Sequence, residues 1–153
     1  MSAPRHLGYT LIELLLVVAI AAVLGAIAIP RYSNATAAYR AHIAAKRIAA
    51  DIALIQARAR ATNATTSMAF TVTTSSYTLP SEKSLASSTA TYVVDLTQSP
   101  YFATVTSFSF SNSTTLQFNG YGMPSSSGRI VVQSGATTKT ITVDGVSGTT
   151  TIQ

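Results

Sequence analysis

The residues with the clearest chemistry lie near the amino terminus, where a single carboxylate, Glu13, stands in an otherwise apolar run from Leu11 to Ile29. A charge near the start of a membrane-spanning segment is costly, so it needs a partner or a role. A glycine, Gly8, and a short basic leader come just before it. Together these residues indicate a processing site that exposes a new amino terminus.

No catalytic or metal-binding set of residues accompanies this carboxylate. The 153 residues include no cysteine, which excludes disulfides, thiolate metal sites and thiol nucleophiles. Of the two histidines, His6 lies in the leader, and His42 is predicted to be a surface or packing residue of a helix. HExxH motifs, glycine-rich phosphate loops and carboxylate pairs do not occur, and Asp144-Gly145 is typical of a hairpin turn. We therefore predict no enzyme activity, no cofactor and no metal.

The apolar run is long enough to span a membrane. At the usual helical rise it extends about 28 Å, roughly one hydrocarbon core. Pro30 follows it and is expected to kink or loosen the helix without having to end it. Arg5 and His6 before the run favour a cytoplasmic amino terminus and an exported carboxyl-terminal part, although Arg31 on the far side weakens that bias.

Three interpretations of this segment compete. A cleaved signal peptide needs small residues at a cut site after the apolar stretch, but here the run continues past such residues, between Ala22 and Ala28. A simple anchor accounts for the length of the run and leaves Glu13 unexplained. A prepilin leader accounts for both, because its cut precedes the apolar segment.

The hexapeptide Gly8-Tyr9-Thr10-Leu11-Ile12-Glu13, with the apolar run and Pro30 behind it, resembles the amino-terminal segment of type IV pilins and type II secretion pseudopilins. Tyr9 is a mild departure, because phenylalanine is usual there. The resemblance implies cleavage after Gly8 by a prepilin peptidase and an N-methylated Tyr9 as the mature amino terminus. It also implies a leader over residues 1–8 and a transmembrane and assembly helix over residues 9–30, inserted in the bacterial inner membrane.

The resemblance implies an ion-pair partner for Glu13. In a lone membrane helix its burial costs up to about 3 kcal/mol. In a filament of stacked helices, its carboxylate can meet the positive amino terminus of Tyr9, either its own or that of a neighbouring subunit. Pairing offsets the desolvation, whereas loss of one partner leaves a buried charge unpaired. We therefore expect Glu13 to set the register between subunits.

Residues 31–63 are predicted to form an amphipathic helix that continues into the globular domain. Between Ala35 and Ala61 there is no glycine or proline, and Thr62-Asn63 is a suitable stop. Arg47 and Asp51 are four residues apart and are expected to pair weakly. The charged residues fall mostly off an apolar stripe with alternating spacings of three and four, which we expect to line the core: Ala45, Ile48, Ile52, Ile55 and Ala59.

Residues 64–153 are predicted to form a β-rich periplasmic domain, which gives an α+β fold of one long helix packed on an antiparallel sheet. Threonine alternates with valine, isoleucine and phenylalanine there, as in half-buried strands. Two segments, Ser81–Thr91 and Pro124–Gly128, are expected to be mobile loops. The predicted strands are Met68–Val72, Ser76–Leu79, Tyr92–Leu96, Val105–Phe110, Thr114–Phe118, Arg129–Gln133, Lys139–Val143 and Thr149–Ile152.

Two weaker motifs indicate which family, among pilins and pseudopilins, the chain resembles most. The helix end Gln56–Asn63 with the strand that follows it, and Phe118-Asn119-Gly120-Tyr121-Gly122, resemble the GspH/FimT family of minor pseudopilins and minor pilins. The resemblance implies a structural subunit that assembles with other pilin or pseudopilin subunits and primes or caps a filament. A major pilin is an alternative, and the sequence leaves open whether the machine serves secretion, pilus assembly or competence.

A DNA-binding subunit for uptake is the second hypothesis. The formal net charge is +5, although only 10% of the residues are charged. The candidate contacts are Arg129, Lys139 and the basic face of the amphipathic helix, and phosphate binding of this kind would weaken steeply with salt. The sequence contains no clustered basic motif, and a solvated helix face is the simpler interpretation of the cations.

Overall fold

The computed structural model of the chain describes residues 9–84, 87–111 and 113–153. The predicted leader, including Gly8, lies outside the described residues. Within those ranges the order of elements is α1 (Leu11–Thr62), β1 (Thr66–Thr71), β2 (Ser76–Ser84), β3 (Ser87–Asp95), β4 (Thr104–Ser109), β5 (Thr115–Phe118), β6 (Gly128–Ser134), β7 (Thr137–Val143) and β8 (Thr150–Ile152). The predicted α+β class and all eight predicted strands are confirmed, with boundaries that differ by several residues in β2 and β3.

Helix α1 runs without interruption through Pro30. Proline removes one backbone donor, and the remaining hydrogen bonds of this alanine- and leucine-rich segment maintain the helix. The predicted stop is confirmed: Asn63 adopts a left-handed φ of 49°, and the Ala64 amide donates to the Ala59 carbonyl at 3.3 Å. This arrangement satisfies a carbonyl that the helix end would otherwise leave unpaired.

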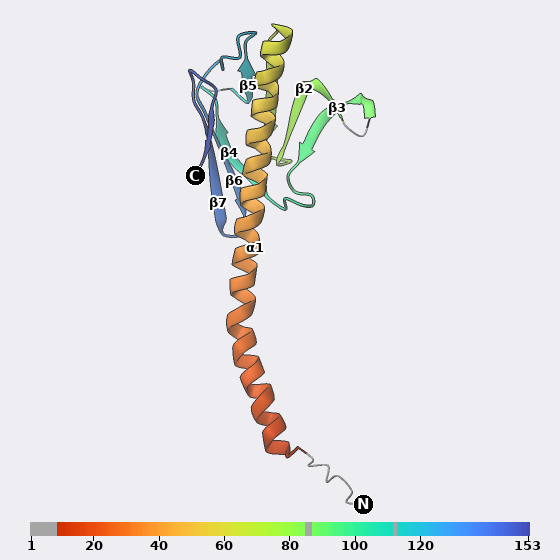
Figure 1. The fold of residues 1–153 in the computed structure, drawn as a ribbon, viewed down its shortest axis with the longest axis vertical. Helices are drawn as coiled ribbons and strands as arrows, with labels where there is room; N and C mark the ends of the chain where they lie inside the picture. Colours follow the sequence, from red (N-terminus) through yellow and green to blue (C-terminus); the bar gives the residue numbers. More distant parts are fainter. Residues whose placement is uncertain (1–8, 85–86, 112) are drawn as a thin grey trace, which may run out of the picture. The chain divides into compact units, whose positions relative to one another are not determined.

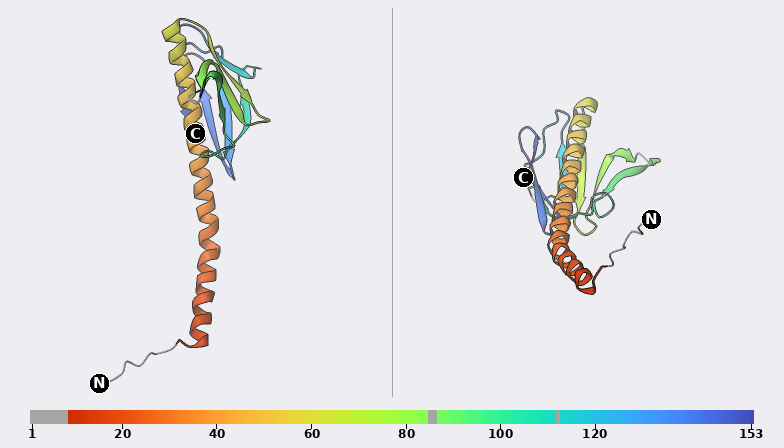
Figure 2. Two further views of the ribbon diagram at one scale, coloured as in Figure 1. Left: turned by 90° about the vertical axis from the view of Figure 1, so that its right-hand side faces the viewer. Right: turned by 60° about the horizontal axis from the view of Figure 1, so that its bottom comes forward.

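The chain divides into two compact units, one that ends at Ala35 and one from Thr36 to Gln153. The second unit contains two four-stranded sheets, in the orders β3-β2-β1-β5 and β4-β6-β7-β8. Every pair is antiparallel. In this unit β2 and β3 lie to one side of α1 and β6 and β7 to the other (Figure 1), and both sheets pack on the same side of the helix (Figure 2, left).

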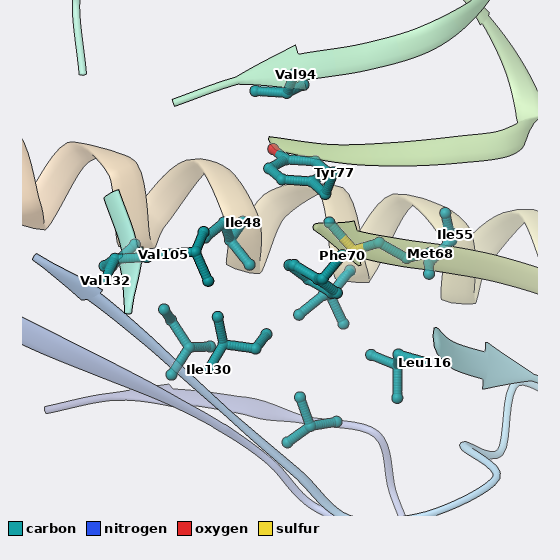
Figure 3. Close-up of a cluster of buried hydrophobic side chains, with 14 of the residues drawn as sticks. Ile48, Ile55, Met68, Phe70, Tyr77, Val94, Val105, Leu116, Ile130 and Val132 are labelled. Carbon is teal, nitrogen blue, oxygen red and sulfur yellow. The ribbon is translucent and has the colours of Figure 1, made fainter. Parts of the chain in front are cut away.

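The core lies between α1 and the two sheets. The predicted stripe is confirmed, since Ala45, Ile48, Ile52, Ile55 and Ala59 are all buried. Figure 3 shows Ile48 and Ile55 of the helix facing side chains from both sheets. These include Met68, Phe70, Tyr77, Val105, Leu116, Ile130 and Val132, all of them buried. Burial of these side chains, each stabilising by about 1.5–3 kcal/mol, is what holds the helix to the sheets.

The expectation of a loop over Ser81–Thr91 is wrong. Strand β2 continues to Ser84 and β3 begins at Ser87, so the described part of this segment forms a hairpin arm. Lys83 pairs with Thr91, and the register shifts on either side of Lys83. The residues of this arm are mostly exposed, so no alternating apolar pattern is needed to hold the strands, and their sequence resembles a loop.

Candidate assembly site

The apolar run of α1 presents its side chains to the surroundings instead of to a core. Every leucine, isoleucine and valine between Leu11 and Ile29 is more than half exposed. The most apolar 18-residue window of α1 has a mean hydropathy of 2.8, and none of it is buried. By length and composition this helix could cross a membrane. An apolar surface of this extent requires a cover, either lipid or other helices.

The predicted site residues Tyr9 and Glu13 meet at the start of this surface. They line one shallow hollow of about 330 Å³ together with Leu14, Val17 and Val18. Tyr9 is 84% exposed, and among the described residues Glu13 has no ion-pair partner. Tyr9, whose backbone nitrogen cleavage after Gly8 would convert to an amine, stands four residues before Glu13 and just outside the helix.

Thr10 is a residue of this site that the sequence reasoning missed. The Glu13 amide donates to the Thr10 carbonyl at 3.1 Å and to the Thr10 hydroxyl at 3.3 Å. Thr10 therefore caps the amino terminus of the helix. Glu13 lies in the first turn, where its negative charge interacts favourably with the helix dipole. The signal was present in the sequence, because Thr10-Leu11-Ile12-Glu13 has the spacing of a capping box.

Pro30, the other residue assigned to assembly, lies inside α1 and not at its end. It interrupts one hydrogen bond of the helix and follows directly on the exposed apolar run. Pro30 therefore lies at the carboxyl-terminal end of the exposed apolar surface, and Tyr9 and Glu13 lie at its amino-terminal end.

A buried polar cluster ties α1 to β2 and β3. The predicted pair forms, with Arg47 Nε 3.2 Å from Asp51 Oδ2. The expectation that the charged residues lie off the buried face is wrong for Asp51, which is 5% exposed. The Tyr77 hydroxyl donates to Asp51 at 2.6 Å, and the Arg47 guanidinium donates to the Tyr92 hydroxyl. Burial, followed by the nearby Asp51 carboxylate, raises the pKa of Tyr77 well above its ordinary value, so the phenol remains a donor.

The end of α1 is joined to two turns, one of which carries the motif Phe118–Gly122. The Gln56 amide donates to the Gly122 carbonyl at 2.8 Å and to the Ser147 carbonyl at 2.7 Å. Gly122 has a φ of +75°, and a Cβ there would lie 2.2 Å from Arg60 Nε. The motif is therefore a structural junction, in which the positive φ of residue 122 favours glycine.

The candidate DNA contacts do not share a surface. In the register of β6 and β7, Arg129 pairs with Thr142, whereas Lys139 pairs with the buried Val132. Cross-strand partners project to the same face, and successive residues alternate, so Arg129 and Lys139 project to opposite faces.

The helix cations are largely engaged within the domain. Arg47 pairs with Asp51, Arg58 with Glu82 at 2.6 Å, and the Arg40 guanidinium lies 4.7 Å from the centre of the Phe102 ring. These residues do not form the continuous basic stripe that binding to many phosphates needs. Among the described residues, no group of histidine, aspartate and glutamate is arranged to hold a metal ion.

Comparison with known proteins agrees with this geometry. The model of the prokaryotic N-terminal methylation motif matches residues 4–29, and that of the type II transport protein GspH matches residues 44–148. No curated protein matches the chain. Among solved structures, the type IV minor pilin FimU of Pseudomonas aeruginosa is similar, with a TM-score of 0.53 and 15% identity. The match covers 74% of this chain and 86% of the FimU chain, and it shows a shared fold.

Proposed function

The chain belongs to the family of the type II transport protein GspH, and we propose that it is a minor subunit of a type II secretion pseudopilus or a type IV pilus. In this proposal a prepilin peptidase cleaves after Gly8, and Tyr9 is then N-methylated. The helix is held in the inner membrane until the subunit enters the filament, and the domain from Thr36 onwards lies in the periplasm. The role is structural, without catalysis.

The observation that carries this proposal is the exposed apolar run of α1 with Tyr9 and Glu13 at its start. A membrane anchor needs only length and hydropathy, and a carboxylate in its first turn is a cost. A filament subunit needs both the apolar run and the carboxylate. Its helix must be soluble in lipid before assembly, and it must take up a fixed register among other helices afterwards. The charge therefore favours assembly over simple anchoring.

The proposed mechanism depends on the order of two events. Before cleavage, the Tyr9 nitrogen is part of a peptide bond and carries no charge. Cleavage creates a cation at Tyr9, four residues before Glu13, and the two groups neutralise each other within one chain or across two. Because an unpaired charge among packed apolar helices is strongly unfavourable, only cleaved subunits would enter the filament.

Processing is tested by replacing Gly8. We expect Gly8→Val to leave the leader attached, because a branched side chain would stand at the scissile bond. The full chain would then migrate more slowly in electrophoresis than the wild-type chain, whose amino-terminal peptide would begin at Tyr9 with one added methyl group. Ala3→Val, in the same leader, is the control and should be processed normally. Unaltered mobility and an unaltered amino terminus in Gly8→Val would refute cleavage at this bond.

A further inference from the structure

A polar hollow lies on the outer face of the second sheet, on the side away from the core. Its volume is about 440 Å³, and the residues that line it are Ser109, Ser111, Ser127, Gly128, Arg129 and Thr142. Strand register places three of them side by side, since Arg129 pairs with Ser109 of β4 and with Thr142 of β7. The sheet thus holds one guanidinium between two hydroxyl groups, and the hollow gathers further hydroxyl groups around them.

The backbone that lines this hollow is fixed in place. Gly128 is buried, and a Cβ on it would lie 2.2 Å from the ring of Phe110, which is itself buried. Residue 128 must therefore be glycine, and β6 lies directly against that ring at the point where Arg129 begins the outer face. This packing fixes the strand, and it therefore fixes the backbone position of Arg129.

Arg129 has no anionic partner among the described residues. The carboxylates of the domain are engaged elsewhere: Asp51 with Tyr77, Glu82 with Arg58 and Asp95 with Thr97. Asp144 follows the strand beside the hollow, but it accepts hydrogen bonds from the Val146 and Ser147 amides. These bonds lower the pKa of Asp144, with those from Ser147 as the main cause, so the carboxylate is held in its own turn.

We propose that this hollow binds a single small oxyanion, a carboxylate or a phosphate group, through the Arg129 guanidinium and the surrounding hydroxyls. A guanidinium presents its donors in a planar fork that matches two oxygens of such a group, and hydroxyls donate to the same oxygens without adding charge. Among the described residues, no acidic or aromatic side chain lines the hollow, which disfavours a cation or a sugar. With Lys139 on the other face of the sheet, the site suits one oxyanion and not a polyanion.

The test is a titration of the full-length, ¹⁵N-labelled chain in detergent micelles, followed by NMR at the Arg129 Nε–H group and the Thr142 amide. The ligands are sodium phosphate and sodium acetate, with sodium chloride at equal ionic strength as the reference. We expect a saturable shift with a dissociation constant of about 1 mM, typical of one charge-assisted contact set. A response to acetate identifies a carboxylate as the ligand, and a response to phosphate alone identifies a phosphoryl group.

Variants separate this site from general charge effects. Arg129→Gln should weaken binding at least tenfold, and Lys139→Gln, which removes a cation from the opposite face, should leave it unchanged. The double variant Ser109→Ala with Thr142→Val should weaken it several-fold with Arg129 still in place. Shifts that do not saturate, that chloride reproduces, or that persist in Arg129→Gln would overturn the proposal. The outcome does not depend on filament assembly, because the isolated chain is titrated.

Discussion

Replacing Glu13 with alanine is expected to weaken association with neighbouring filament subunits about a hundredfold. The amine of processed Tyr9 would then be buried among apolar helices without its carboxylate, and the loss of one partner of a buried pair costs about 3 kcal/mol or more, which corresponds to this factor. The measurement is recovery of partner subunits after crosslinking and pull-down of the full chain. Recovery equal to that of the wild type would refute the role of Glu13 in setting register.

Two further variants separate the proposed pairing from the helix cap that the structure contains. Glu13→Gln keeps the size of the side chain and removes its charge, so it should fail nearly as severely as alanine. Thr10→Ala removes the hydroxyl that accepts from the Glu13 amide at 3.3 Å and should cost only about 1 kcal/mol of helix stability. If Thr10→Ala instead matched Glu13→Ala, the carboxylate would matter for the start of the helix and not for assembly.

The second large effect is expected at Asp51. Asp51→Ala should lower the free energy of unfolding by about 3 kcal/mol, because it leaves the buried Tyr77 hydroxyl without its acceptor and Arg47 without its counter-charge. The Arg47 side chain is 36% exposed and recovers part of its hydration, so the loss of stability should stay below the upper end of the range for fully buried ion pairs. Thermal unfolding of the full chain in detergent, read by circular dichroism, measures it.

A double-mutant cycle distinguishes this explanation from a simple loss of packing. Tyr77→Phe keeps the ring and removes the hydroxyl, so the second substitution should cost much less in a chain that already carries Asp51→Ala. The interaction energy between the two sites is expected to be about 1–3 kcal/mol. If the two effects simply add, the hydroxyl and the carboxylate do not stabilise each other, and the cluster is not the tie between α1 and β2.

The sequence predicted those parts of the fold that depend on regular patterns. The spacing of Ile48, Ile52 and Ile55 identified the buried face of α1, and Asn63 marked its end, because helix periodicity and a left-handed cap are local properties. The strands were found by the alternation of threonine with apolar residues. The exposed helix start was predicted from Glu13 together with Gly8 before it and the length of the apolar run behind it, all of which are local features of the sequence.

The features that sequence reasoning missed depend on contacts between distant residues. Asp51 has the same polarity as a surface aspartate, and the approach of Tyr77 from β2, which joins Arg47 in compensating the burial of the carboxylate, is not visible in the sequence. The hairpin arm, the described part of Ser81–Thr91, is held by backbone pairing, which leaves little pattern in its mostly exposed side chains. Likewise, Arg129 and Lys139 are both cations on neighbouring strands, and only the register of β6 and β7 puts them on opposite faces.

The central claim, that the processed apolar helix is covered by other filament subunits, is tested most directly by disulfide crosslinking. The chain has no cysteine, so Ala19→Cys provides one thiol within the apolar run, and a partner pilin or pseudopilin subunit would carry a second thiol in its own apolar helix. We predict a crosslinked pair for the processed chain and none when Gly8→Val blocks processing. A control variant, Thr151→Cys, places a thiol at an exposed residue of the domain and should crosslink efficiently, which shows that the conditions permit crosslinking. If that control crosslinks and the processed Ala19→Cys chain does not, assembly through the helix is contradicted.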